Sequence, residues 1–153
     1  MTLSEYLFSP HGRMNRAKYW IYVVVSIAII VVLIAVMGIV WAGRLYDPRG
    51  GFVFPLGSSI AFGVVYLVLL IVGILVGIKR LHDRDKSGWW LLVFYLVPII
   101  LSWVSAILSR HGVGFLFALG SLAFSIWALV ELGCLRGTVG SNRYGADPLE
   151  PKA

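Results

Sequence analysis

Four apolar runs constrain this chain more than any other feature of its sequence. An α-helix of about 20 apolar residues crosses a hydrocarbon core of roughly 30 Å, and each run is long enough for one such helix. Only 13% of the residues are charged, against about 25% in a soluble domain, so the chain lacks the polar surface that a soluble globule needs. We predict an all-α integral membrane four-helix bundle, with spans at about 19–42, 57–78, 89–108 and 114–135.

The four spans and their connections form a single predicted membrane domain over residues 1–148, followed by a flexible tail over residues 149–153. No small-residue cleavage site ends the first run, so we interpret it as a retained anchor and not as a signal peptide. Before it, Leu3, Tyr6 and Leu7 have helical spacing, which predicts a short interfacial helix.

The distribution of Lys and Arg predicts the orientation. Of the 13 basic residues, three lie in the two connections that follow the first and third spans: Arg44, Arg49 and Arg110. All the others lie before the first span, between the second and third, or after the fourth. Cytoplasmic segments carry the excess of Lys and Arg, so we expect both termini and the central connection in the cytoplasm.

Two spans carry a face of small residues. These faces hold Ser59, Gly63, Tyr66, Gly73 and Gly77 in the second span, and Gly114, Ala118, Ser121, Ser125 and Ala128 in the fourth. Small residues let helix backbones approach closely in lipid. We interpret both faces as packing surfaces, with a ligand groove as the alternative for the face of the second span. We predict that the second and fourth spans pack on each other.

Three charged motifs flank the spans. The central one, KRLHDRDKSGWW (Lys79–Trp90), is predicted to be the loop between the second and third spans, with its tryptophans at the membrane interface. GRMNRAKYW (Gly12–Trp20) precedes the first span. GTVGSNRYGADP (Gly137–Pro148) follows the fourth and is expected to dock on the cytoplasmic face as a turn-rich segment, with an anion-binding nest as the alternative.

In this order, the three motifs resemble the bacterial inner-membrane family called domain of unknown function 805. The resemblance covers nearly the whole chain, and its most specific pieces are Arg-Leu-His-Asp and Ser-Gly-Trp-Trp. The family's usual pattern has Arg-Arg before Leu-His-Asp, where this chain has Lys79-Arg80. The resemblance implies a small multi-span protein of the bacterial inner membrane and implies no particular activity.

Packed spans would bring the three motifs together at the cytoplasmic face. The residues proposed for a site there are Arg13, Arg16, Arg80, His82, Asp83, Ser87, Trp89, Arg136, Asn142 and Tyr144. Basic residues at a membrane surface attract anionic lipid, so the expected partners are anionic headgroups, a protein partner or a second copy of the chain. The alternative is that these residues only set the topology and the aromatic belt.

Other chemistry has weaker support in the sequence. His82 beside Asp83 suggests an enzyme acting on a lipid headgroup, but no second catalytic partner or zinc ligand set stands near them in sequence. We predict no cofactor and no metal site. The tail lacks the Gly-Lys-Ser/Thr ending of a P-loop, and the chain has no element suited to nucleic acid.

Glu131 is the one acidic residue within a predicted span. An intramembrane carboxylate indicates function by default, so a transporter or channel component, working as an oligomer, is the alternative to a non-enzymatic interaction protein. At its predicted depth near the cytoplasmic end, Glu131 could instead form a structural ion pair, with Arg80 or Arg136 as the expected partner.

Overall fold

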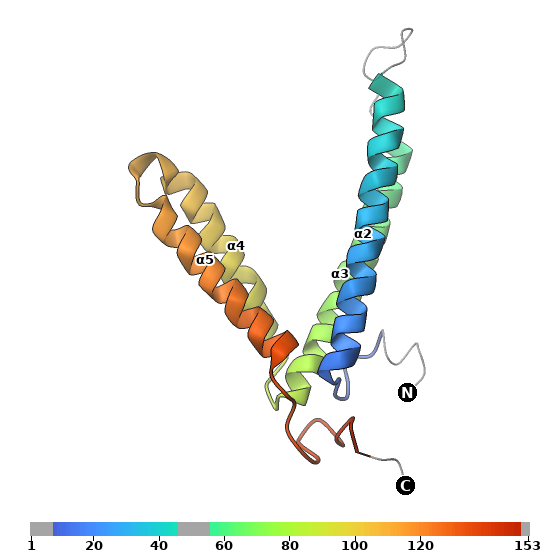
Figure 1. The fold of residues 1–153 in the computed structure, drawn as a ribbon, viewed down its shortest axis with the longest axis vertical. Helices are drawn as coiled ribbons and strands as arrows, with labels where there is room; N and C mark the ends of the chain where they lie inside the picture. The colour runs from blue at the N-terminus through green and yellow to red at the C-terminus, as the bar shows by residue number, and fades with distance from the viewer. Residues whose placement is uncertain (1–7, 46–55, 151–153) are drawn as a thin grey trace. The chain divides into compact units, whose positions relative to one another are not determined.

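The computed structural model describes residues 8–45 and 56–150. Within these residues the named elements are helices and short helical turns, and the segment after Cys134 is irregular, with an isolated bridge between Asn142 and Gly145 (Figure 1). Four helices are long and apolar enough to cross a membrane, which confirms the predicted fold class. They are α2 (Arg16–Leu45), α3 (Leu56–Asp83), α4 (Trp90–Leu108) and α5 (Gly114–Leu129), which continues into the π-helical turn η2 (Val130–Cys134); the 3-10 turn η1 (Ser109–His111) connects α4 to α5. The predicted interfacial helix at Leu3–Leu7 lies outside the described residues.

The chain divides into two compact units. The first comprises Met1–Trp20 and Ile74–Ala153, and the second comprises Ile21–Gly73. We call the first the motif unit, because all three charged motifs lie in it, and the second the span unit. Helices α2 and α3 each contribute residues to both.

In the span unit, α2 and α3 run side by side. The Tyr22 hydroxyl of α2 donates a 2.6 Å hydrogen bond to the carbonyl of Leu69 in α3. A Cβ added at Gly73 would lie 3.0 Å from the same hydroxyl, so the glycine makes room for the tyrosine. Most other side chains of these two helices are apolar and exposed, as suits contact with lipid.

In the motif unit, α4 and α5 form an antiparallel pair joined by η1. The Ser121 hydroxyl donates to the carbonyl of Pro98 over 2.9 Å, and a Cβ at Gly114 would lie 2.5 Å from the carbonyl oxygen of Ser105. A Cβ at Gly77 of α3 would lie 2.9 Å from Leu91 of α4. At these positions the small-residue faces therefore meet α4, and not each other as we predicted.

Helix α3 extends beyond its predicted end near Ile78. Its 28 residues measure about 42 Å at 1.5 Å per residue, more than the roughly 30 Å of a hydrocarbon core. The helix can therefore continue into the interface, where charged residues are tolerated. Lys79–Asp83, predicted as loop, form its last turn, and the connection to α4 begins at Arg84.

Candidate functional site

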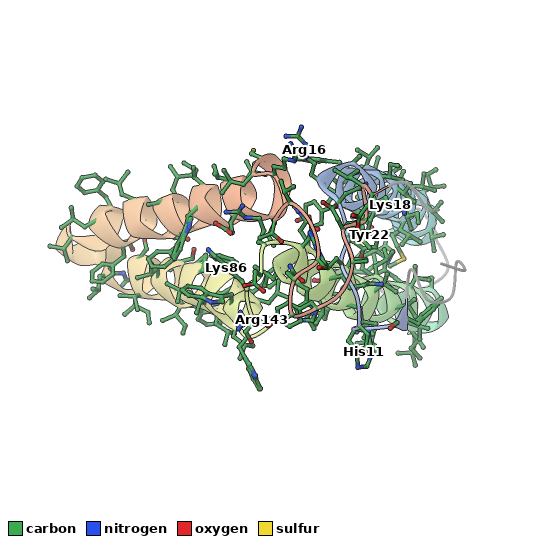
Figure 2. All side chains as sticks on the ribbon, turned by 90° about the horizontal axis from the view of Figure 1, so that it is seen from below. His11, Arg16, Lys18, Tyr22, Lys86 and Arg143 are labelled. Carbon is green, nitrogen blue, oxygen red and sulfur yellow. The ribbon has the colours of Figure 1, made fainter. Side chains whose placement is uncertain are left out.

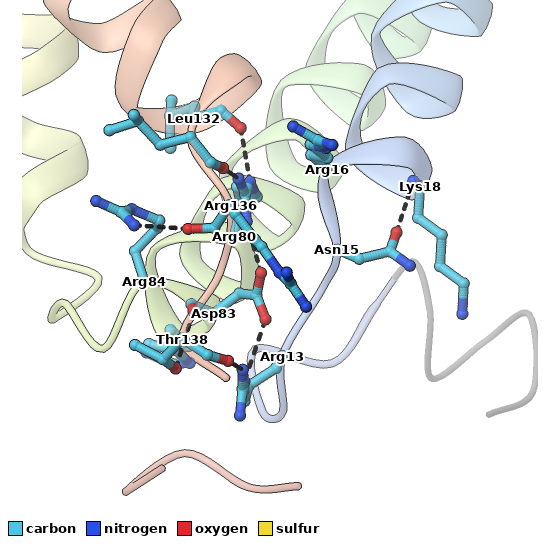
Figure 3. Close-up of polar contacts among 12 residues, drawn as sticks. Arg13, Asn15, Arg16, Lys18, Arg80, Asp83, Arg84, Leu132, Arg136 and Thr138 are labelled. Carbon is cyan, nitrogen blue, oxygen red and sulfur yellow. Dashed lines mark hydrogen bonds and ion pairs between the residues drawn. The ribbon is translucent and has the colours of Figure 1, made fainter. Parts of the chain in front are cut away.

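The last turn of α3 holds a buried ion-pair cluster. Arg80 and Asp83 are three residues apart, so both lie on one face of the helix. The Nη1 of Arg80 lies 2.6 Å from one carboxylate oxygen of Asp83, and the Nε of Arg13 lies 3.1 Å from the other. Arg80 is 0% exposed, Asp83 3% and Arg13 6%. We call these three residues the Asp83 cluster (Figure 3).

Arg80 of this cluster, together with Trp20 and Arg16, also caps the end of the fourth span. The last carbonyls of a helix have no partner within it, and a positive charge near them is favoured by the helix dipole. Donors from the first two motifs satisfy them: Arg80 donates to Leu132 and Leu135, Trp20 to Gly133, and Arg16 to Cys134. The π-helical turn η2 is therefore held by side chains that are distant in sequence.

The third motif joins the cluster through its backbone. Arg13 donates to the carbonyls of Thr138 and Gly140, each over 2.5 Å, and more weakly to Gly145. In return, the N–H of Thr138 donates to the carbonyl of Asp83 over 2.8 Å. The segment presents carbonyl oxygens to a cation, whereas an anion-binding nest would present N–H groups.

Gly137 lies directly against the Asp83 carboxylate. A Cβ added there would lie 2.0 Å from Oδ2, far inside any van der Waals contact. Only glycine fits at this position without displacing the carboxylate or the tail. Gly137 was not among the predicted site residues, because a glycine in a turn-rich tail carries no signal of what it packs against.

Glu131 lies in η2 and forms a second ion-pair cluster. One of its carboxylate oxygens is 3.1 Å from the Nε of Arg84 and 3.0 Å from the Nζ of Lys86, and Glu131 itself is 3% exposed. The predicted partners, Arg80 and Arg136, are wrong. Arg80 pairs with Asp83 instead. Glu131 lies in a π-helical turn, in which the N–H of Leu135 donates to the carbonyl of Val130, and the depth of Glu131 alone could not identify its partners.

His82 and Asp83 point to different partners. The carboxylate of Asp83 contacts two arginines, while the ring of His82 stacks on Tyr144 with centroids 3.8 Å apart and an interplanar angle of 5°. The side-chain amide of Asn142 donates to the carbonyl of His82 over 2.9 Å. The adjacent His and Asp therefore connect the end of α3 to the tail and do not form a hydrogen-bonded dyad.

The remaining predicted site residues lie at the surface of the motif unit. Arg16 and Arg136 are exposed, and the Arg16 side chain points away from the ribbon in Figure 2. Both line a cavity of about 170 Å³ whose wall includes Asp83 and Asp147. The N–H of Leu149, and secondly that of Gly140, hold the pKa of Asp147 below its usual value.

Ser87 and Trp89 lie apart from this cavity, in a groove between α3 and α4 that also includes His82 and Tyr144. Across the described residues, no three His, Cys, Asp or Glu side chains lie close enough to hold a metal ion. The structure therefore brings Arg13, Arg80 and Asp83 together as one buried cluster. The other candidates line two surface hollows, except Asn142, which holds the tail to the end of α3.

Comparison with known proteins supports the membrane assignment. A family model described as "Protein of unknown function (DUF805)" matches residues 7–146. The uncharacterized protein YiiR of Escherichia coli K12 is 32% identical over 155 residues, which cover 99% of this chain and 94% of the relative. Inner membrane proteins YhaH and YhaI of the same strain are each 30% identical, covering 92% and 90% of this chain and 88% and 83% of the relatives.

No solved structure matches the chain. Two relatives are named as inner membrane proteins, and four helices of this chain are suited to crossing a membrane, which together indicate a multi-pass protein of the inner membrane. With a family match over most of its length, the chain belongs to the DUF805 family of proteins of unknown function.

Proposed function

We propose that this protein is non-enzymatic and that its cytoplasmic face binds the phosphate of anionic phospholipids. The observation that carries the proposal is the cavity of about 170 Å³ between Arg16 and Arg136. Both arginines are exposed, and neither forms an ion pair with a carboxylate among the described residues. They are the basic candidates that the buried cluster leaves available to a ligand.

The charge balance around this cavity favours an anion. Asp83 lies in its wall, but Arg13 and Arg80 already pair with that carboxylate. With Arg16 and Arg136 included, four arginines stand against Asp83 and Asp147, a net charge of two positives. The first residue of α2 is Arg16, so the positive end of a helix dipole lies at the same place.

The proposed orientation places this cavity at the headgroups of the inner leaflet. All three motifs meet in one unit, which supports placing both termini and the central connection on one side of the membrane. The excess of Lys and Arg there supports the cytoplasmic side. Cytoplasmic leaflets carry anionic lipid, and each basic residue near such a surface contributes about 1 kcal/mol.

The test compares lipid retention by the purified full chain and by an Arg16→Gln/Arg136→Gln double variant. Native mass spectrometry would count phosphatidylglycerol and phosphatidylcholine molecules that stay bound after detergent extraction from mixed vesicles. We expect the double variant to lose preference for phosphatidylglycerol by roughly 30-fold, since about 2 kcal/mol is lost at the surface.

Arg110→Gln is the matched control, because it removes the same charge from the opposite predicted side of the membrane and should leave the preference intact. An unchanged preference in the double variant would overturn the proposal. A protein that shows no preference for either lipid but forms a stoichiometric complex with another membrane protein would favour the alternative of a protein partner.

A further inference from the structure

A groove of about 420 Å³ lies in the motif unit between the end of α3 and the start of α4. Its volume falls within the range of about 300–1,000 Å³ that small-molecule sites occupy. One part is apolar and the other polar: the lining includes Ile74, Ile78 and Leu92, and also His82, Ser87 and Tyr144. This groove is separate from the cavity between Arg16 and Arg136, and it has no part in the proposed headgroup binding.

The order of the lining residues matches the order of polarity across a membrane interface. Along α3, Ile74 and Ile78 precede His82 by eight and four residues, about 12 Å and 6 Å of helix rise. The apolar wall therefore extends from the interface into the span, while the polar residues lie at the interfacial end. An amphiphile with one acyl chain has the same arrangement of apolar and polar parts.

His82 lies at the polar end of the groove. Its Nδ1 is buried and has no hydrogen bond of normal geometry among the described residues, and the backbone of Gly12 lies within hydrogen-bonding range of the ring. The stack on Tyr144 holds the ring in place. Together, His82, Ser87 and Tyr144 give this end of the groove polar side chains suited to a hydroxyl or ester of a ligand.

The walls of the groove are in contact where they meet, so the groove is not a loosely packed gap. A Cβ added at Gly88 would lie 3.1 Å from Ile78, which shows that the loop already touches α3. Trp89 beside it is 76% exposed, as an interfacial tryptophan at the membrane surface would be. From these observations we infer that the groove binds one acyl chain of a membrane amphiphile, with the polar end of the amphiphile against His82, Ser87 and Tyr144.

The experiment uses the full chain in nanodiscs with lysophosphatidylcholine or lysophosphatidylglycerol that carries a photoactivatable diazirine midway along the acyl chain. After irradiation, mass spectrometry of peptides locates the adducts. We expect adducts at Ile74, Ile78 and Leu92 with both lipids, because the groove selects the chain and not the headgroup charge. Filling the groove with Ser87→Trp or Leu92→Trp should reduce the adducts at Ile74 and Ile78 roughly tenfold, the equivalent of one order of magnitude in Kd.

Ile100→Trp is the matched control, since Ile100 is also an exposed residue of α4 but does not line the groove; it should leave labelling unchanged. Labelling spread evenly over lipid-facing residues, and unaffected by either tryptophan in the groove, would mean annular lipid only and would overturn the inference. Failure of the headgroup proposal appears differently, as equal retention of the two lipid classes by the native chain. The two outcomes can therefore be told apart.

Discussion

The interactions within the motif unit differ in kind from those within the span unit. The motif unit buries Lys79, Arg80, Asp83 and Glu131, each at most 3% exposed. In the span unit, the described parts of α2 and α3 expose mainly aliphatic side chains, and the hydrogen bond from Tyr22 to Leu69 connects the two helices. Charge is concentrated in one unit and nearly absent from the helical part of the other.

This difference shows which part of the chain specifies how distant segments meet. Lipid is as apolar as the side chains of the spans, so burial of apolar surface supplies little drive between helices. A buried ion pair stabilises weakly against a hydrophobic substitute, but removing one partner alone is very costly. We therefore expect the Asp83 cluster to specify how the segments of the motif unit meet, because each of its three charges has its partner within the cluster.

The largest expected effect comes from removing Arg80. Arg80→Ala leaves Asp83 with one cation and leaves the carbonyls of Leu132 and Leu135 without their donor, so we expect a loss of about 3–5 kcal/mol. Unfolding in mixed micelles with increasing dodecyl sulfate would measure it. Arg110→Ala, which replaces an exposed arginine, should cost about 0.5 kcal/mol or less. Equal losses for the two variants would contradict the idea that the Asp83 cluster specifies how the segments of the motif unit meet.

A pair of glycine substitutions tests the contrast between the units directly. Gly137→Ala forces a Cβ into the Asp83 carboxylate, so we expect it to cost about 1–3 kcal/mol, as overpacking does. Gly63→Ala in the span unit meets nothing within 4 Å and should be neutral or stabilising by up to about 1 kcal/mol. The same unfolding assay applies, and a destabilising Gly63→Ala with a neutral Gly137→Ala would reverse the comparison.

Glu131→Gln should have a moderate effect. The side chains of Arg84 and Lys86 are 25% and 30% exposed, so water can solvate them once the carboxylate is gone, and we expect a loss of about 1 kcal/mol. Proteoliposomes with an internal pH dye would test the transport alternative in the same variant. A proton flux in the native chain that Glu131→Gln abolishes would favour transport over a structural ion pair.

The smallest expected effect is in the span unit. Tyr22→Phe removes the hydrogen bond to Leu69, and such bonds between membrane helices are worth about 0.6 kcal/mol on average. The unfolding midpoint should therefore shift only slightly. A loss as large as that of Arg80→Ala would mean that polar contacts organise both units alike.

The spans could be predicted from the sequence because an apolar run of sufficient length has few alternatives to a membrane helix. The polar partners could not all be predicted. Arg80 and Asp83 pair at a spacing of three residues within one helix, which is a local relation that can be read from a sequence. The pairing of Glu131 with Arg84 and Lys86 depends on where α3 ends and on the π-helical turn η2, neither of which leaves a pattern in hydropathy.

The sequence by itself determined the membrane class, the four helices and the presence of three charged motifs around them. The helices follow from the length of each apolar run compared with the thickness of a bilayer, and the motifs follow from where the charged residues lie between the runs. Only the tertiary structure decided which charges are buried in ion pairs and which remain exposed. Arg13 and Arg16 are the same residue type, three positions apart in sequence. Arg13 is buried in an ion pair with Asp83, whereas Arg16 is exposed. That division depends on packing between segments more than fifty residues apart. Gly137 lies against Asp83, and Arg13 donates to the carbonyl of Thr138.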